Sequence, residues 1–172
     1  MTVSKPETTE YAPFYAGYVA KASDTSDILI ELANQPASLN DLLGSLSEEK
    51  ALYRYAEGKW SIKELIAHMS DAERIFGYRA LRFARNDKTP LASFDENTYA
   101  VISKADKRSL ENLLEEFRLL RQANLILFQT FGEEEHIRIG IASEAKMSVR
   151  ALIYVMAGHV QHHINIIQER YL

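Results

Sequence analysis

The chain has 172 residues, 47% of them hydrophobic and 26% charged, with a formal net charge of −4. These values fit one globular domain spanning residues 1–172, and the acidic balance argues against binding to nucleic acid. No apolar run approaches the roughly 20 residues that cross a bilayer, and cysteine is absent, which excludes disulfides and thiolate ligands. Residues 1–10 lack the apolar core of a secretory signal, so we expect a flexible N-terminus on a cytoplasmic protein.

The first amphipathic segment covers residues 13–33. Its apolar side chains recur at helical intervals, and Tyr15 and Tyr18 are among them. Pro36, in the run Asn34-Gln35-Pro36, is expected to end this helix because proline lacks the amide donor that the helix interior needs. Tyr15 and Tyr18 fit either the wall of a pocket or ordinary packing between helices.

The second helix has the clearest start signal. Ser61 and Glu64 have the spacing of a capping box, and the helix is expected to run from there to about residue 85. Trp60 and Leu65 have the spacing of the hydrophobic staple that often accompanies such a cap. This placement favours a structural role for the tryptophan over a catalytic one.

Two further helices are predicted, over residues 109–131 and from Ser148 to the chain end. The segment 132–147 between them reads as an irregular or short extended connection, with His136 as a solvated surface residue. Four long helices with polar outer faces indicate an all-α fold, a four-helix bundle. Residues 37–60 form a long connection of the crossover kind, so the helix order is not expected to be simple up-down-up-down.

Histidines occupy core-facing positions on two of these helices. His159 and His163 are four residues apart, so one helix face carries both imidazoles one turn apart. His68 lies in the inward stripe of the second helix, at a height that matches the other two if these helices are antiparallel. Imidazole nitrogens at such positions are typical ligands of zinc and related cations. We therefore predict a metal site at His68, His159 and His163.

A plain bundle with buried, hydrogen-bonded histidines is the alternative interpretation. It is disfavoured because burying three imidazoles without partners costs about 1–3 kcal/mol each. His162 is rotated away from the other two histidines of its helix, and we expect it outside the ligand set, in a supporting or interface role.

Several motifs, spread over nearly the whole chain, resemble the DinB/YfiT-like superfamily of metalloenzymes. They are residues 57–74, 78–85, 94–96, 149–152, 158–163 and 169–172. The resemblance implies a four-helix bundle with a long crossover and a homodimer. It also implies that His68, His159 and His163 are the metal ligands. Gln161 departs from the pattern, since many relatives carry glutamate there.

Three protein ligands leave a coordination position open, which is the pattern of catalytic rather than structural sites. Imidazole ligands suit several divalent transition metals, and we expect zinc or nickel. Members of the resembled family include transferases that use low-molecular-weight thiols. We therefore predict a metal-dependent thiol S-transferase or hydrolase acting on a small-molecule substrate.

Two points stay open at the sequence level. Asp71, one turn beyond His68, fits either a second-shell carboxylate that orients an imidazole or a solvated helix charge. The competing function is a non-catalytic, stress-related dimeric module that binds metal. An open pocket at the metal favours the enzyme, whereas a module tolerates a sealed site.

Overall fold

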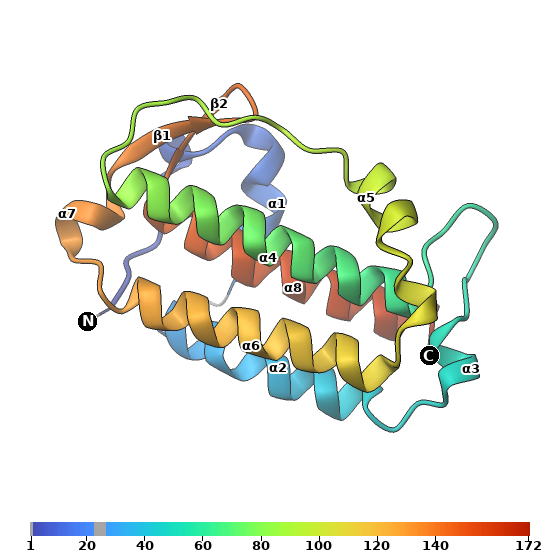
Figure 1. Ribbon diagram of the computed structural model, residues 1–172. Coiled ribbons are helices and arrows are strands. Elements are labelled where there is room, and N and C mark those ends of the chain that lie inside the picture. The colour runs from blue at the N-terminus through green and yellow to red at the C-terminus, as the bar shows by residue number, and fades with distance from the viewer. Residues whose placement is uncertain (1, 23–26) are drawn as a thin grey trace.

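Four long helices lie along one another in the computed structural model, which describes residues 2–22 and 27–172 (Figure 1). They are α2 (Ile28–Leu43), α4 (Ile62–Ala84), α6 (Leu110–Phe128) and α8 (Val149–Arg170). Each of α4 and α2 packs against both α6 and α8, so α4 and α2 lie diagonally opposite. The predicted four-helix bundle is confirmed. Among the described residues, no helix has the length and apolar character needed to cross a membrane.

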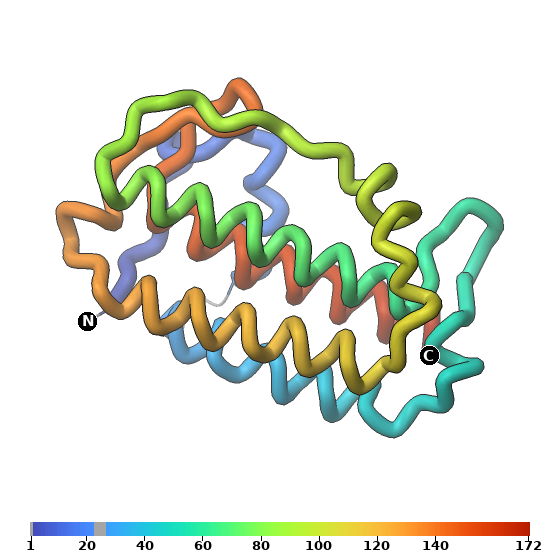
Figure 2. The backbone as a smooth tube through the Cα atoms, in the orientation of Figure 1, coloured from blue at the N-terminus to red at the C-terminus, as the bar shows by residue number. Residues whose placement is uncertain are grey.

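The long crossover joins α4 to α6 rather than α2 to α4. Helices α4 and α6 point the same way, and residues 85–109 run back along the bundle between them, as the tube in Figure 2 shows. The sequence interpretation placed the crossover at residues 37–60. The structure corrects this, because α2 continues to Leu43 and residues 44–61 join two helix ends at the same end of the bundle.

The predicted helix over residues 13–33 is wrong. The structure has η2 (Pro13–Tyr15) and α1 (Ala16–Val19), and α2 begins only after the Asp27 cap; residues 23–26 of the prediction lie outside the described residues. Pro36 does not end α2 but sits inside it. Proline leaves the carbonyl four residues earlier without its helical partner. Here that carbonyl, of Leu32, accepts a hydrogen bond of 3.2 Å from Nη1 of Arg121.

The starts of the other long helices follow the sequence signals. Ser61 accepts from the Glu64 amide and the Glu64 carboxylate accepts from the Ser61 amide, which completes the capping box of α4. Ser109 and Ser148 cap α6 and α8 in the same manner, each accepting from the amide three residues later. Asp27 caps α2 by accepting from the Leu29 amide, so polar side chains that satisfy free helix amides fix all four bundle helices at their first turn.

Several short elements were not predicted. They are η1 (Thr8–Glu10), α3 (Glu48–Ala51), α5 (Glu96–Ser103), η3 (Ala105–Lys107) and α7 (Glu133–His136). The 132–147 segment also holds an antiparallel hairpin of β1 (Ile139–Ala142) and β2 (Ala145–Ser148). Its two turn residues, Ser143 and Glu144, both have positive φ values, 51° and 62°. The Leu91 amide of the crossover donates to the Ile141 carbonyl, and the Leu91 carbonyl accepts from the Ser143 amide. These two hydrogen bonds hold the crossover against the hairpin.

The N-terminal segment has fixed contacts in the structure, although we expected residues 1–10 to be flexible. Val3 is 1% exposed, and its carbonyl accepts a hydrogen bond of 3.2 Å from the Tyr154 hydroxyl. Glu10 forms an ion pair with Arg150, whose guanidinium also bonds to Ser4. Residues 3–10 are thus attached to the first turns of α8 by apolar and polar contacts.

The buried side chains form two apolar clusters along the bundle. One surrounds the hairpin end and includes Phe76 and Ala157; the other surrounds the start of α4 and includes Leu65 and Val160. His159 lies in the chain between Ala157 and Val160, one from each cluster. This histidine therefore lies where the two apolar clusters meet.

Candidate metal centre

Three imidazole rings meet between α4 and α8. Nε2 of His159 lies 3.0 Å from Nε2 of His68 and 3.1 Å from Nε2 of His163. Ligand atoms of all three lie within 4.8 Å of one another. The structure therefore brings together the three histidines chosen from the sequence.

Helix geometry explains this convergence. His159 and His163 share one face of α8, and the antiparallel neighbour α4 supplies His68. The antiparallel arrangement is visible at the ends, where the Tyr171 hydroxyl beyond α8 donates to the Trp60 carbonyl just before α4, at 2.7 Å. The predicted match in height between the two helices is confirmed.

Burial keeps the three imidazoles neutral. His68, His159 and His163 are only 6–8% exposed. Loss of hydration lowers the pKa of His68 to about 4. The same burial, together with the neighbouring imidazoles, holds the pKa values of His159 and His163 well below the usual value of 6.5. All three rings are therefore uncharged at neutral pH, which is the form that binds metal.

The contacts between the rings fit a shared cation better than hydrogen bonds. A ring nitrogen carries either one hydrogen or one lone pair, so Nε2 of His159 cannot make two well-aligned hydrogen bonds to its two neighbours. Three imidazoles on one zinc ion, at about 2.0–2.1 Å with tetrahedral angles, have nitrogens roughly 3.3 Å apart. The observed separations of 3.0 and 3.1 Å are close to that value. The donor set fits a divalent transition metal.

Aromatic rings surround the imidazoles. The Trp60 ring centre lies 4.7 Å from that of His68, and the centres of Tyr18 and Phe76 lie 5.4 Å and 6.0 Å from that of His159. The approach of Tyr18 depends on Gly158, because a Cβ at position 158 would lie 1.8 Å from the Tyr18 carbonyl oxygen. The glycine beside the first α8 histidine thus lets α1 reach the site.

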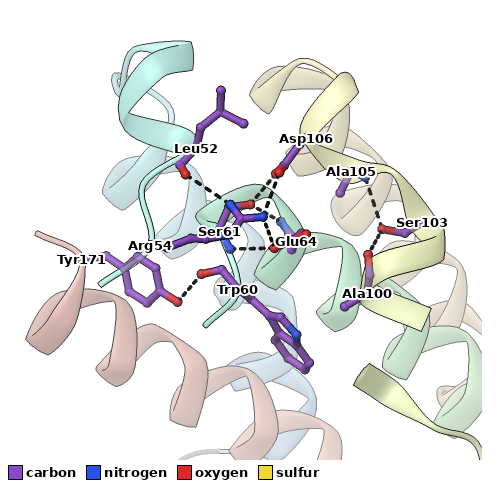
Figure 3. A network of polar contacts seen from close by, with 10 residues as sticks. All are labelled: Leu52, Arg54, Trp60, Ser61, Glu64, Ala100, Ser103, Ala105, Asp106 and Tyr171. Atoms are coloured by element: carbon purple, nitrogen blue, oxygen red, sulfur yellow. Dashed lines mark hydrogen bonds and ion pairs between the residues drawn. The ribbon is translucent and has the colours of Figure 1, made fainter. Parts of the chain in front are cut away.

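A polar network holds Trp60 in place, as Figure 3 shows. Arg54 bonds to Glu64 at 2.8 Å and to Asp106 at 2.9 Å, and Asp106 accepts from the Ser61 hydroxyl at 2.6 Å. In Figure 3 the Trp60 indole points away from this network, while its carbonyl receives the Tyr171 hydroxyl. The cap of α4 therefore fixes one aromatic wall of the site.

A pocket of about 430 Å³ opens beside the histidines. Its wall is mostly aromatic and is contributed by five parts of the chain. It is lined by Ala12, Phe14, Tyr15, Tyr18, Trp60, His68, Phe76, Arg79, Phe94, Glu96, Ser143, Ala145, His159 and His163. Tyr15 and Tyr18, for which the sequence left two interpretations open, both line this pocket.

A second pocket, of about 230 Å³, also reaches the site. His163 and Trp60 line both pockets, and Tyr55, Lys59 and Asn97 are among the other residues of the smaller one. The imidazole cluster is therefore not sealed inside the bundle.

The structure does not bring Asp71 to the imidazoles. Its carboxylate lies 3.6 Å from Arg74, and among the described residues it has no hydrogen bond to a histidine. Burial raises the pKa of Asp71, and Glu116 raises it further. Gln161 likewise bonds elsewhere, to Asn165 at 2.8 Å.

The remaining two histidines lie outside the cluster. The His162 ring packs against Tyr18 and His163, with ring centres 5.6 Å and 5.2 Å apart. The predicted solvent exposure of His136 is wrong: it is 4% exposed, because α7 turns it inward beneath the bundle end.

Arg79, Ser143 and Glu96 are pocket residues to which the sequence interpretation gave no role. Arg79 continues the inward stripe of His68 on α4, so an arginine at a core-facing position was the available signal. Ser143 and Glu96 come from the hairpin turn and from the start of α5. The sequence predicted only an irregular or short extended connection over residues 132–147 and did not predict α5, so no sequence pattern placed these two residues at the site.

A sequence model of the DinB superfamily matches residues 31–167, which include all three histidines. The chain belongs to the DinB superfamily. A "putative metal-dependent hydrolase" of Bacillus licheniformis is 30% identical over 141 residues, covering 78% of this chain and 77% of the relative. Proteins with the same description from Halalkalibacterium halodurans and Oceanobacillus iheyensis are 26% and 23% identical, over 81% and 82% of this chain and the same shares of their own lengths.

A solved structure shares the fold of this DinB superfamily member. It is YfiT from Bacillus subtilis, described as a probable metal-dependent hydrolase with an unusual four-helix bundle topology. The TM-score is 0.76 at 16% sequence identity, over 96% of this chain and 90% of YfiT. The parallel pair α4 and α6, joined by the long crossover, is therefore part of an architecture that persists at low identity.

Proposed function

We propose that this protein is a metal-dependent hydrolase of small molecules, with His68, His159 and His163 as the ligands of one divalent metal. The observation that carries the proposal is the open pocket of about 430 Å³ beside three converging, neutral imidazoles. A structural site is normally closed by four protein ligands, whereas a catalytic site keeps a position for water or substrate. The description of the curated relatives as metal-dependent hydrolases supports the same chemistry.

A divalent metal held by three imidazoles supplies Lewis acidity and the activation of water or a thiol at neutral pH. The chain's own residues prepare the site for it. Burial keeps the histidines deprotonated, and Trp60 and Tyr18 hold two of the rings in orientation. The aromatic pocket excludes bulk water from an apolar substrate group, which strengthens polar interactions at the site. We propose zinc or nickel as the metal, because imidazole suits both.

Transfer of a low-molecular-weight thiol is the second candidate function. The observation that favours it is the presence of two pockets that are both lined by Trp60 and His163. Two entrances give separate places to a thiol and to its electrophilic acceptor, whereas hydrolysis needs only one organic substrate. A non-catalytic dimeric module is less favoured, since it has no need of an open pocket. Homodimerisation stays a proposal from the family resemblance.

Elemental analysis tests the metal site most simply. The purified protein and a His159→Ala variant are compared after dialysis, with His162→Ala as the matched control from the same helix. We expect about one metal ion per chain in the wild type and in the control, and a loss of most metal from His159→Ala. Equal metal content in all three proteins would refute the site.

Activity assays on the metal-loaded protein then separate the functions. Ester and amide panels without thiol report hydrolysis, and the same electrophiles with added thiols report transfer. Turnover without thiol supports the hydrolase, and thiol-dependent turnover supports the transferase. Bound metal without turnover in either assay favours the module.

A further inference from the structure

Arg79 is a buried cation in the wall of the metal-site pocket. It is 2% exposed, yet it is one of the residues that line the 430 Å³ pocket together with His68 and His159. Its guanidinium carbon lies 5.9 Å from the centre of the Phe76 ring, and the His159 ring lies 6.0 Å from the same centre. One phenyl ring therefore links the cation to the imidazole cluster.

The partners of Arg79 are all neutral. Nη2 donates to the Ala92 carbonyl and to the Ser143 hydroxyl, each at 2.9 Å, and Tyr15 is a further hydrogen-bonding neighbour. A guanidinium has five N–H donors, and the first two bonds come from a single nitrogen. Among the described residues, no carboxylate lies within ion-pair distance of Arg79.

Arg121, which is also fully buried, forms an ion pair within the bundle. It is 0% exposed and donates to both carboxylate oxygens of Glu73, at 2.8 and 2.9 Å. A buried charge without a counter-ion is unfavourable, and burial accordingly lowers the pKa of Arg79. Arg121 also lines a cavity, but Glu73 of the same chain supplies its counter-ion. Arg79 lines the histidine pocket without such a partner among the described residues, and there a ligand can supply the missing anion.

We propose that Arg79 binds the carboxylate of a small-molecule substrate whose apolar part fills the aromatic pocket and whose reacting group faces the three histidines. This inference rests on the proposed function for the reacting group, but the carboxylate subsite itself does not require a metal. Arginine suits the site because its planar donors match a carboxylate. Glu96 also lines the pocket, and its negative charge favours a monoanion over a dianionic phosphate.

The test uses metal-free protein, so that a carboxylate cannot bind to metal instead. The probe is 3-phenylpropanoate, compared with its neutral amide and with 3-phenylpropyl phosphate. Trp60 is the only tryptophan of the chain and lines the pocket, so quenching of its fluorescence reports binding directly. We expect the carboxylate to bind about ten-fold more tightly than the amide, and more tightly than the phosphate.

Variants then assign this preference to Arg79. Arg79→Gln is expected to bind acid and amide equally, and Arg79→Lys to keep part of the preference. Arg82→Gln is the matched control, because Arg82 lies on the same helix but pairs with Asp87 outside the pocket. If Arg79→Gln does not fold, the comparison of acid, amide and phosphate on the wild type still tests the proposal.

The outcomes separate this inference from the proposed function. Equal binding of acid and amide by the wild type, or a preference that survives in Arg79→Gln, would overturn the subsite whatever the metal content. Tighter binding of the phosphate would overturn the assignment to a carboxylate. Metal content is measured on the same variants, and we expect Arg79→Gln to retain metal. If His159→Ala keeps its metal, the proposed metal site is refuted. The carboxylate subsite is still supported in that case, provided that the wild type binds the acid more tightly than the amide.

Discussion

Two buried polar clusters cross this bundle, and only one of them is complete. Around Arg121, Glu73 supplies two carboxylate oxygens, Gln35 a side-chain oxygen at 2.7 Å and Asn124 an amide that donates to Glu73. Charges and donors there are balanced within the chain. In the histidine cluster, three like groups face one another instead, and Nδ1 of His163 is buried without a hydrogen-bond partner.

This difference indicates that the Arg121 cluster is structural and that the histidine cluster is a binding site. The Arg121 cluster fastens α2, α4, α6 and α8 together, since Gln35 also donates to the Ala157 carbonyl at 2.8 Å. Its interactions require nothing from outside. The histidine cluster lowers stability in the metal-free chain, because neutral imidazoles are buried with incomplete partners. Such a site is retained for what it binds.

The largest effect is expected from acid on the metal-free protein. Because the folded-state pKa of His68 is about 4 and the unfolded value is about 6.5, the unfolded chain binds more protons between them. Stability is therefore full above pH 6.5 and falls as the pH decreases, by roughly 2 kcal/mol at pH 5 from His68 alone. His159 and His163 add losses of the same sign.

Urea denaturation between pH 7.5 and 5 measures this acid sensitivity, in a range where most carboxylates stay ionised. His159→Leu is expected to show a shallower dependence, because one of the three titrating groups is gone. A metal-free stability that does not change over this range would show that the imidazoles are not held neutral by burial.

Breaking the complete cluster should cost less than protonation of all three histidines together. Glu73→Ala leaves Arg121 buried without its carboxylate, and we expect a loss of about 3–5 kcal/mol in the free energy of unfolding. Glu115→Ala is the matched control, because its ion pair with Arg118 is half exposed and is worth at most about 1 kcal/mol. Chemical denaturation at pH 7 measures both. Similar losses in the two variants would contradict the structural role of the buried pair.

Metal should stabilise the histidine cluster by mass action. At a free zinc concentration of 100 times the dissociation constant, we expect a gain of about 2.7 kcal/mol over the metal-free protein. His159→Leu is expected to lose this gain while staying folded, because the replaced ring is buried and leucine places an apolar side chain of similar size there. Thermal unfolding with and without zinc measures the effect. An equal gain in the variant would place the bound metal elsewhere.

The smallest of these effects concerns Gly158. Alanine normally stabilises a helix interior relative to glycine, but here its Cβ meets the Tyr18 carbonyl at 1.8 Å. We expect Gly158→Ala to lose about 1–3 kcal/mol through displacement of α1. Gly17→Ala is the control, since nothing lies within 4 Å of its added Cβ. Denaturation curves of both variants measure the loss. An unchanged free energy of unfolding in Gly158→Ala would mean that α1 does not pack on α8.

The sequence predicted the bundle and its histidines because both are local patterns on regular helices. Ser61 and Ser148 mark helix starts through side-chain capping, and spacing i, i+4 sets His159 above His163. Pro36 led to a wrong prediction of the helix end. The helix tolerates this proline because Arg121, 85 positions away, donates to the carbonyl that the proline leaves without a partner. The hairpin turn at Ser143 and Glu144 carries none of the usual glycine or asparagine signals for positive φ. Helix capping and histidine spacing did not predict the residues of the pocket wall. These residues come from the hairpin, the crossover and α1, which are brought together only by folding.

X-ray absorption spectroscopy of the zinc- or nickel-loaded protein identifies the atoms bound to the metal. We expect three nitrogen ligands at about 2.0–2.1 Å with imidazole scattering, together with at least one light-atom ligand that an added thiol replaces. Fewer than three imidazoles at the metal, or a coordination sphere filled by protein groups that no added thiol enters, would contradict it.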